Sequence, residues 1–221
     1  MKATLSLLWD KETRRFFTIL LGGVLFAPAG SFAGLVQLLS TRNASIARPG
    51  GGNGNSVAPV ITADGRFVVF SSSANDLVPC DNNQPGLDAF LFDRASNITV
   101  LVSANFNGTG GGNGNSMAGQ ASADGRYIVF QSNASDLLAG DTNGVSDIFV
   151  RDRQTGSNIL VSVAADGGWG NGASTDPVMT PDGRYVAFIS AATNLVTGDT
   201  NGIPDVFVRD LLSGSTRLAG C

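Results

Sequence analysis

Two loops of the sequence carry oxygen-bearing side chains at the same relative positions. They span residues 140–147 and 198–205, and each places an Asp, an Asn and an Asp at intervals of two and four residues. Calcium takes roughly six to eight oxygen ligands, and alternate side chains of a tight loop, with a backbone carbonyl, supply several of them. The candidate metal ligands are Asp141, Asn143, Asp147, Asp199, Asn201 and Asp205. The candidate ion is calcium.

A purely structural role explains the same loops. Asp141 and Asn143 are typical of Asx turns, in which a side-chain oxygen accepts a hydrogen bond from the backbone two residues further on. The spacing differs from an EF-hand, because Gly144 is the fourth residue counted from Asp141 and not the sixth. The corresponding loop 81–88 contains one extra residue and Pro85, which weakens the calcium interpretation there. Both interpretations stay open at this point.

The composition excludes several classes of chemistry. The chain contains no histidine, which removes Ser-His-Asp and Cys-His catalysis and the commonest zinc ligand. Its formal net charge is −4, so no basic face is expected to hold a phosphate backbone. We therefore expect a non-enzymatic protein with no nucleic-acid partner and no certain cofactor.

Two short sequence motifs, called phrases here, each occur three times, with a nearly constant distance between them. An Asp-Gly-Arg phrase followed by an apolar run occupies residues 63–70, 123–130 and 181–188. A second phrase, bounded by Asp at both ends, occupies residues 88–93, 147–152 and 205–210. Successive copies of the first phrase begin 60 and then 58 residues apart. Such a repeat predicts one supersecondary unit stacked on copies of itself.

Each repeat predicts four short strands, for example over residues 57–62 and 67–71 in the first unit and 148–151 and 159–163 in the second. The Asp64-Gly65 pair predicts a two-residue type I′ hairpin, which needs positive φ at both residues. The second strand is apolar at nearly every position, as expected when both faces are covered. Four antiparallel strands in sequence order form a propeller blade. The predicted fold is all-β and propeller-like, with three four-stranded blades.

The phrases that begin at Asp182 and Asp205 resemble the WD40-like repeats of TolB-type β-propellers. The resemblance covers residues 50–221, as repeats over 50–109, 110–167 and 168–221. It implies an exported bacterial propeller that serves mainly as a binding platform. Three blades cannot close a ring when the smallest propellers have about four. The chain is therefore a partial propeller, or a half that pairs with a second copy as a homodimer.

The N-terminal residues 1–33 are typical of an export signal. A basic start precedes an apolar run over residues 16–27, which has the length of a signal-peptide core and is short for a membrane span. Ser31 and Ala33 are the small residues that a signal peptidase requires. We expect a signal helix that is removed, by the general or the twin-arginine route, leaving residues 34–49 as an N-terminal strand and linker. The alternative is an uncleaved anchor helix.

The leading functional hypothesis is an exported, periplasmic or secreted, binding platform for a protein or small ligand. It has no stable membrane span once the signal is removed. The alternatives are a calcium-stabilised surface protein and the propeller part of a larger peptidase-like or lyase-like enzyme.

Each repeat also contains an Arg after the hairpin and an Asp at the end of the third strand. We expect these to form structural ion pairs: Arg66, Arg126 and Arg184 with Asp93, Asp152 and Asp210.

Overall fold

The computed structural model describes four stretches of the chain, residues 6–10, 15–19, 51–81 and 86–219. The chain divides into two compact units, Met1–Gln37 and Leu38–Cys221. Within the four described stretches, none of the secondary structure is a helix of the length and hydropathy needed to cross a membrane. The named elements there are all strands, which confirms the predicted all-β class.

The described residues of the first unit form one hairpin. Strand β1 (Ser6–Asp10) pairs antiparallel with β2 (Arg15–Ile19). This hairpin is the described part of the predicted leader over residues 1–33. The rest of that leader, with its cleavage site, and the strand and linker predicted for residues 34–49 lie outside the described residues. The signal peptide stays a prediction.

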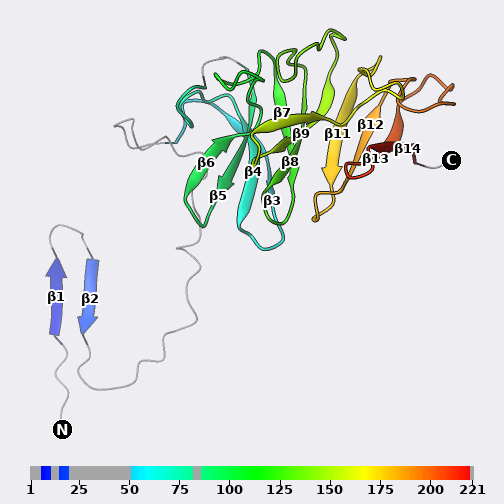
Figure 1. Cartoon of the computed structure of the whole chain (residues 1–221). Helices are drawn as coiled ribbons and strands as arrows, with labels where there is room; N and C mark the ends of the chain where they lie inside the picture. Colours follow the sequence, from blue (N-terminus) through cyan, green and yellow to red (C-terminus); the bar gives the residue numbers. More distant parts are fainter. Residues whose placement is uncertain (1–5, 11–14, 20–50, 82–85, 220–221) are drawn as a thin grey trace. The chain divides into compact units, whose positions relative to one another are not determined.

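The described residues of the second unit form three four-stranded antiparallel sheets, named blades 1 to 3 (Figure 1). Blade 1 comprises β3 (Ser56–Ile61), β4 (Phe67–Ser72), β5 (Asp88–Asp93) and β6 (Ile98–Leu101). Blade 2 comprises β7 (Ser116–Ala121), β8 (Tyr127–Ser132), β9 (Asp147–Asp152) and β10 (Ser157–Leu160). Blade 3 comprises β11 (Ser174–Met179), β12 (Tyr185–Ser190), β13 (Asp205–Asp210) and β14 (Ser215–Leu218). Each sheet follows sequence order, so the predicted three-blade partial propeller is confirmed.

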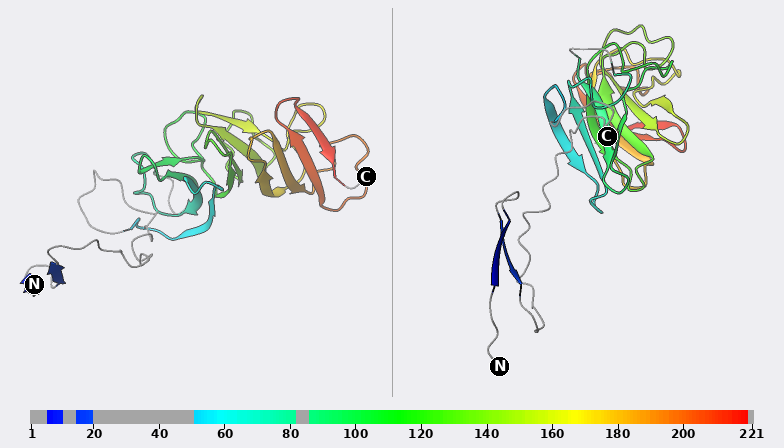
Figure 2. Two further views of the ribbon diagram at one scale, coloured as in Figure 1. Left: turned by 90° about the horizontal axis from the view of Figure 1, so that it is seen from below. Right: turned by 90° about the vertical axis from the view of Figure 1, so that its left-hand side faces the viewer.

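The blades follow one another along the second unit and bury a core at each junction (Figure 2). Alternate residues of a strand point to opposite faces of its sheet. We call the face of a blade that meets the next blade its forward face, and the opposite face its backward face. Val69 and Leu91 lie on the forward face of blade 1 and pack with Ile128 and Phe130 on the backward face of blade 2. Complete burial of one such side chain stabilises the fold by roughly 1.5–3 kcal/mol. The apolar run of the second strand is thus explained by coverage on both faces, as predicted.

The second junction repeats the first with its own residues. Val129 and Val150 on the forward face of blade 2 pack with Val186 and Phe188 on the backward face of blade 3. These four side chains are at most 1% exposed.

The predicted type I′ turn at Asp64-Gly65 is wrong. Only Gly65 has a positive φ, of 71°, and the connection has four residues, closed by a hydrogen bond of 2.9 Å from the Thr62 N–H to the Phe67 carbonyl. Asp64 Oδ1 accepts hydrogen bonds from the Thr62 hydroxyl at 2.6 Å and from the Arg66 N–H at 3.0 Å. This Asx turn holds Asp64 outside the left-handed region, so the glycine alone supplies the positive φ.

Candidate functional site

The first strands of the three blades, β3, β7 and β11, are neighbours, and each contains a bulge. The pairing register shifts between Val57 and Val60 in β3, between Ala118 and Ala121 in β7, and between Thr175 and Val178 in β11. A bulge leaves backbone groups outside the sheet ladder. Side chains of the preceding blade fill part of that gap: Ser71 Oγ accepts from the Ala118 N–H at 2.8 Å. Gln131 Oε1 likewise accepts from the Asp176 N–H at 3.0 Å.

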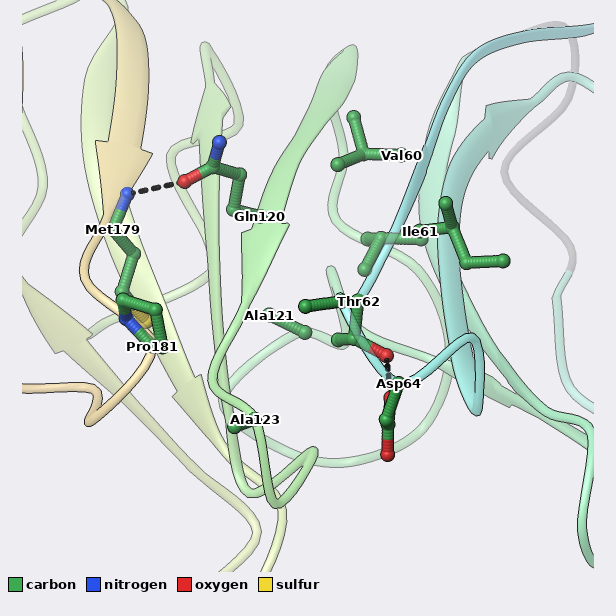
Figure 3. A pocket seen from close by; sticks show the side chains of 11 residues that line it. Val60, Ile61, Thr62, Asp64, Gln120, Ala121, Ala123, Met179 and Pro181 are labelled. Carbon is green, nitrogen blue, oxygen red and sulfur yellow. Dashed lines mark hydrogen bonds between the residues drawn. The ribbon is translucent and has the colours of Figure 1, made fainter.

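A cavity of about 310 Å³ opens between these three strands (Figure 3). Its walls are mainly aliphatic or small, and come from all three blades: Val60, Ile61, Ala63, Val69, Ala121, Ala123, Met179 and Pro181. The polar lining residues are Thr62, Asp64 and Gln120. A volume of this size is at the lower limit of roughly 300–1,000 Å³ for ligand pockets. A second hollow of about 370 Å³ shares Val60 and Gln120 with it.

The polar groups of the cavity are held in fixed positions. Gln120 Oε1 accepts a hydrogen bond of 2.9 Å from the Met179 N–H, which ties β7 to β11. The hydrogen bond from Thr62 holds the pKa of the Asp64 carboxyl below its ordinary value, with the Arg66 N–H as the next cause. Asp64 is therefore ionised at neutral pH and is the one titratable side chain among the described residues that line the cavity. The cavity thus combines aliphatic walls with one ionised carboxylate, which accepts a hydrogen bond from the Thr62 hydroxyl.

The loop between β8 and β9 brings the predicted ligands Asp141, Asn143 and Asp147 together, but largely as protein-bonded groups. Asn143 Nδ2 donates to Asp147 Oδ2 at 2.7 Å, and Asn143 Oδ1 accepts from the Val145 N–H at 3.1 Å. Asp147 Oδ1 accepts from the Ser162 hydroxyl at 2.6 Å. Burial raises the pKa of Asp147 to about 6, and the nearby charge of Asp141 adds to this. The Asx-turn alternative describes Asn143 well.

The loop between β12 and β13 has the same turn, but its first acidic residue, Asp199, differs from Asp141 in its surroundings. Asn201 Nδ2 donates to Asp205 Oδ2 at 2.7 Å, and Asn201 Oδ1 accepts from the Ile203 N–H at 3.0 Å. Asp199 is 8% exposed, and its Oδ1 is buried with no hydrogen-bond partner. The carboxylate therefore has an unsatisfied oxygen inside the loop.

The loop between β4 and β5 contains a feature that the sequence analysis missed. Asp81 is 6% exposed, and its Oδ1 is also buried without a partner. Burial, followed by the charge of Asp88, raises the pKa of Asp81 to about 7. The signal was available, since Asp81 occupies the place of Asp141 and Asp199 in its repeat. Over the described stretches, no group of three or more Asp, Glu, His or Cys side chains converges, so calcium remains a prediction.

The predicted Arg–Asp pairs are confirmed, one in each blade. Arg126 donates from Nε and from its second terminal nitrogen to the two oxygens of Asp152, at 3.0 and 2.8 Å. The Arg66–Asp93 and Arg184–Asp210 pairs have the same two-bond geometry. The hydrogen bond from Arg126 is the main reason that the pKa of Asp152 falls to about 2. These pairs fasten the start of the second strand of a blade to the end of the third.

The forward face of blade 3 is exposed, unlike its counterparts. Val206 is 45% exposed, whereas Ile148 at the equivalent position of blade 2 is 0% exposed. Ile189 and Val178 on neighbouring strands are 38% and 48% exposed. Among the described strands, none covers this face. Blade 1 is different, because Phe90 on its backward face is already 0% exposed.

No protein-family model matches the chain, and no curated protein matches it. Among solved structures, a putative TolB from Agrobacterium tumefaciens is 17% identical, with 73% of this chain and 49% of that chain covered and a TM-score of 0.45. The tricorn protease is 16% identical, with 73% and 13% covered and a TM-score of 0.43. A prolyl endopeptidase is 10% identical, with 98% and 26% covered and a TM-score of 0.44. The chain thus spans about half of the TolB chain, and the propeller-like assignment rests on the three stacked sheets themselves.

Proposed function

We propose that this chain is an exported, non-enzymatic binding protein that holds its ligand in the cavity between β3, β7 and β11. The observation that carries the proposal is that all three blades contribute to one apolar cavity with a single carboxylate, Asp64, in its lining. Gln120 is fixed across the same cavity by its bond to Met179. Concave apolar sites with a few positioned polar groups are the usual form of ligand sites.

The lining also defines the chemistry of the ligand. Aliphatic walls favour an aliphatic side chain, because burial removes its apolar surface from water. The ionised Asp64 favours a positive group beside that side chain. We therefore expect a short peptide segment in which an aliphatic residue is followed by Lys or Arg.

The test is a titration of the purified chain with the capped dipeptide acetyl-Leu-Lys-amide, followed by amide chemical shifts in NMR. We expect shifts at Val60 and Gln120, and Ala123→Trp should weaken binding by roughly tenfold or more because Ala123 is exposed and lines the cavity. Ala95→Trp is the matched control, because Ala95 is an exposed alanine outside the cavity lining. Equal binding by both variants, or shifts elsewhere, would contradict the proposal.

Export and the lack of enzymatic activity are parts of the same proposal. The absence of histidine from the sequence supports the second part, and the leader predicted over residues 1–33 supports the first. Mass spectrometry of the chain recovered from an exporting cell should find Gly34 as the first residue. A chain that keeps Met1 in the cytoplasmic fraction would overturn the export assignment.

A second copy of the chain is the partner that best fits the exposed forward face of blade 3. In blades 1 and 2 the equivalent face is covered by the next sheet, and Ile148 there is 0% exposed. A head-to-tail partner would need a free backward face on blade 1, but Phe70 and Phe90 there are 3% and 0% exposed. The partner is therefore the same face of another blade 3, which gives an isologous homodimer.

A further inference from the structure

Two of the three loops that join the second and third strands share an unsatisfied carboxylate. Asp81 precedes β5 and Asp199 precedes β13, at equivalent places in their repeats. They are 6% and 8% exposed, and in each the Oδ1 atom is buried and has no hydrogen-bond partner. Both are thus more than nine-tenths buried, in contrast to a solvated acidic loop.

A buried oxygen of this kind requires a positive partner. Buried polar atoms in folded proteins are nearly always hydrogen-bonded, and an ionised carboxylate without a partner is strongly unfavourable away from water. The described neighbours donate no hydrogen bond to either Oδ1 atom. A metal cation beside each Oδ1 atom would supply the missing partner.

A second carboxylate makes a cation the better partner. Asp88 is 1% exposed and interacts directly with Asp81 through its side chain. In the third loop, Asp205 follows six residues after Asp199 and is held by Asn201. Two carboxylates and an amide are hard oxygen ligands, which suit Ca²⁺, and its flexible coordination accepts backbone carbonyls and waters as the remaining ligands.

We propose that the chain binds two calcium ions, one at Asp81 and Asp88 in the β4–β5 loop and one at Asp199 and Asp205 in the β12–β13 loop. With two carboxylates at each site, the affinity falls in the weaker range of extracellular calcium modules, with Kd roughly 0.1–1 mM. Calcium would then fasten the ends of β5 and β13 to the loops that precede them.

The middle loop does not share this feature, so the number of ions is two and not three. Asp141, the equivalent of Asp81 and Asp199, is only half-buried and has no buried oxygen without a partner. Asp147 in the same loop accepts bonds on both oxygens, from Ser162 and Asn143. Asn143 is also tied to the following connection, because its Nδ2 donates to the Gly170 carbonyl at 3.1 Å. Protein donors therefore take the place of the ion between β8 and β9.

The test is a calorimetric titration of the full chain with CaCl₂ after EDTA treatment, together with thermal unfolding. We expect a stoichiometry of two, and 10 mM CaCl₂ should raise the melting temperature by roughly 5–10 °C. Asp81→Asn and Asp199→Asn should each reduce the stoichiometry to one. Asp141→Asn is the matched control and should leave it at two.

Each other outcome overturns the proposal. No heat and no thermal shift with the unaltered chain would mean that Asp81 and Asp199 hold no calcium, and this result needs no variant to fold. Loss of an ion in Asp141→Asn would place calcium in the middle loop instead. An equal shift with 10 mM MgCl₂ in place of CaCl₂ would mean that the effect is one of general ionic strength.

Discussion

The backbone of Gly125 in blade 2 lies directly against the ring of Phe67 in blade 1, with no room for a β-carbon between them. The contact recurs one blade further on, where a β-carbon on Gly183 would lie 2.7 Å from Cδ2 of Tyr127. In blades 2 and 3, the hairpin glycine thus packs against the aromatic ring that begins the second strand of the preceding blade. The same glycine serves the turn and the junction between blades.

Because of this double role, Gly125→Ala should destabilise the chain more than Gly65→Ala. Gly65 and Gly125 have φ values of 71° and 69°, so alanine is strained at both by about 1–2 kcal/mol. At Gly65 the nearest atom to an added β-carbon is a terminal nitrogen of Arg94 at 3.5 Å, which leaves room. At Gly125 the added carbon overlaps Phe67, which should cost about 1–3 kcal/mol more. Urea unfolding of both variants measures the difference, and equal losses would show that the junction is not under this constraint.

The exposed face of blade 3 makes a second matched pair. Val206→Lys should leave the fold intact, because Val206 is 45% exposed, and should convert the homodimer to a monomer in light scattering. Ile148→Lys at the equivalent position should unfold the chain, since Ile148 is 0% exposed and a buried unpaired charge destabilises by several kcal/mol. Ile98→Lys, which alters an exposed side chain of blade 1, is the control for the added charge. A dimer that survives Val206→Lys would exclude this face as the interface.

The sequence predicted the blades well because repetition identifies equivalent positions three times over. The strand that begins at Phe67 was expected to end at Ser71 and ends at Ser72. The turn type at Asp64 was wrong because an Asp-Gly pair also fits a four-residue connection once the Thr62 hydroxyl bonds to the carboxylate. The cavity was out of reach, since Gln120 and Met179 are 59 residues apart and meet only through blade stacking.

The metal candidates show a similar limit. Spacing favoured Asp141 and Asp199 over Asp81, because the first loop has an extra residue and Pro85. Burial alters this order: Asp81 and Asp199 each have a buried oxygen without a partner, and Asp141 has none. Spacing in the sequence shows which residues share a loop. Whether a carboxylate oxygen is free to bind a cation depends on the hydrogen-bond donors that the rest of the fold brings to it.

The Arg–Asp pairs predict a local titration. In Arg126→Gln, the pKa of Asp152 should rise from about 2 toward its ordinary value of 3.8, because the bidentate hydrogen bonds that stabilise the ionised form are lost. Asp93 in blade 1 keeps its Arg66 partner and is the internal control, with its pKa staying at about 2. Carboxyl ¹³C NMR against pH measures both groups in one sample. An unchanged Asp152 would mean that backbone donors, and not Arg126, hold its pKa down.

The buried carboxylates predict how stability depends on pH when calcium is removed by EDTA. Asp81 titrates near 7 and Asp147 near 6 in the folded chain, against 3.8 in the unfolded chain, so the folded state binds more protons between these values. The free energy of unfolding should therefore fall as the pH rises from about 4 to about 7. Below that range the pair at Asp152 reverses the slope, because its stabilisation is lost as the pH falls from about 4 to about 2. Stability in EDTA should thus be greatest near pH 4.

Calcium should change the dependence of stability on pH between pH 4 and 7 through Asp81 and not through Asp147. An ion at Asp81 favours the ionised form and removes its preference for the proton, so the loss of stability between pH 4 and 7 becomes smaller. The contribution of Asp147 should persist, since both of its oxygens are bonded to Ser162 and Asn143. Guanidinium unfolding at pH 4, 5, 6 and 7, with calcium and with EDTA, measures the two profiles. In Asp81→Asn the calcium effect on the slope should disappear and the Asp147 part should remain. Parallel profiles in the unaltered chain would show that calcium, if bound, does not displace the proton at Asp81.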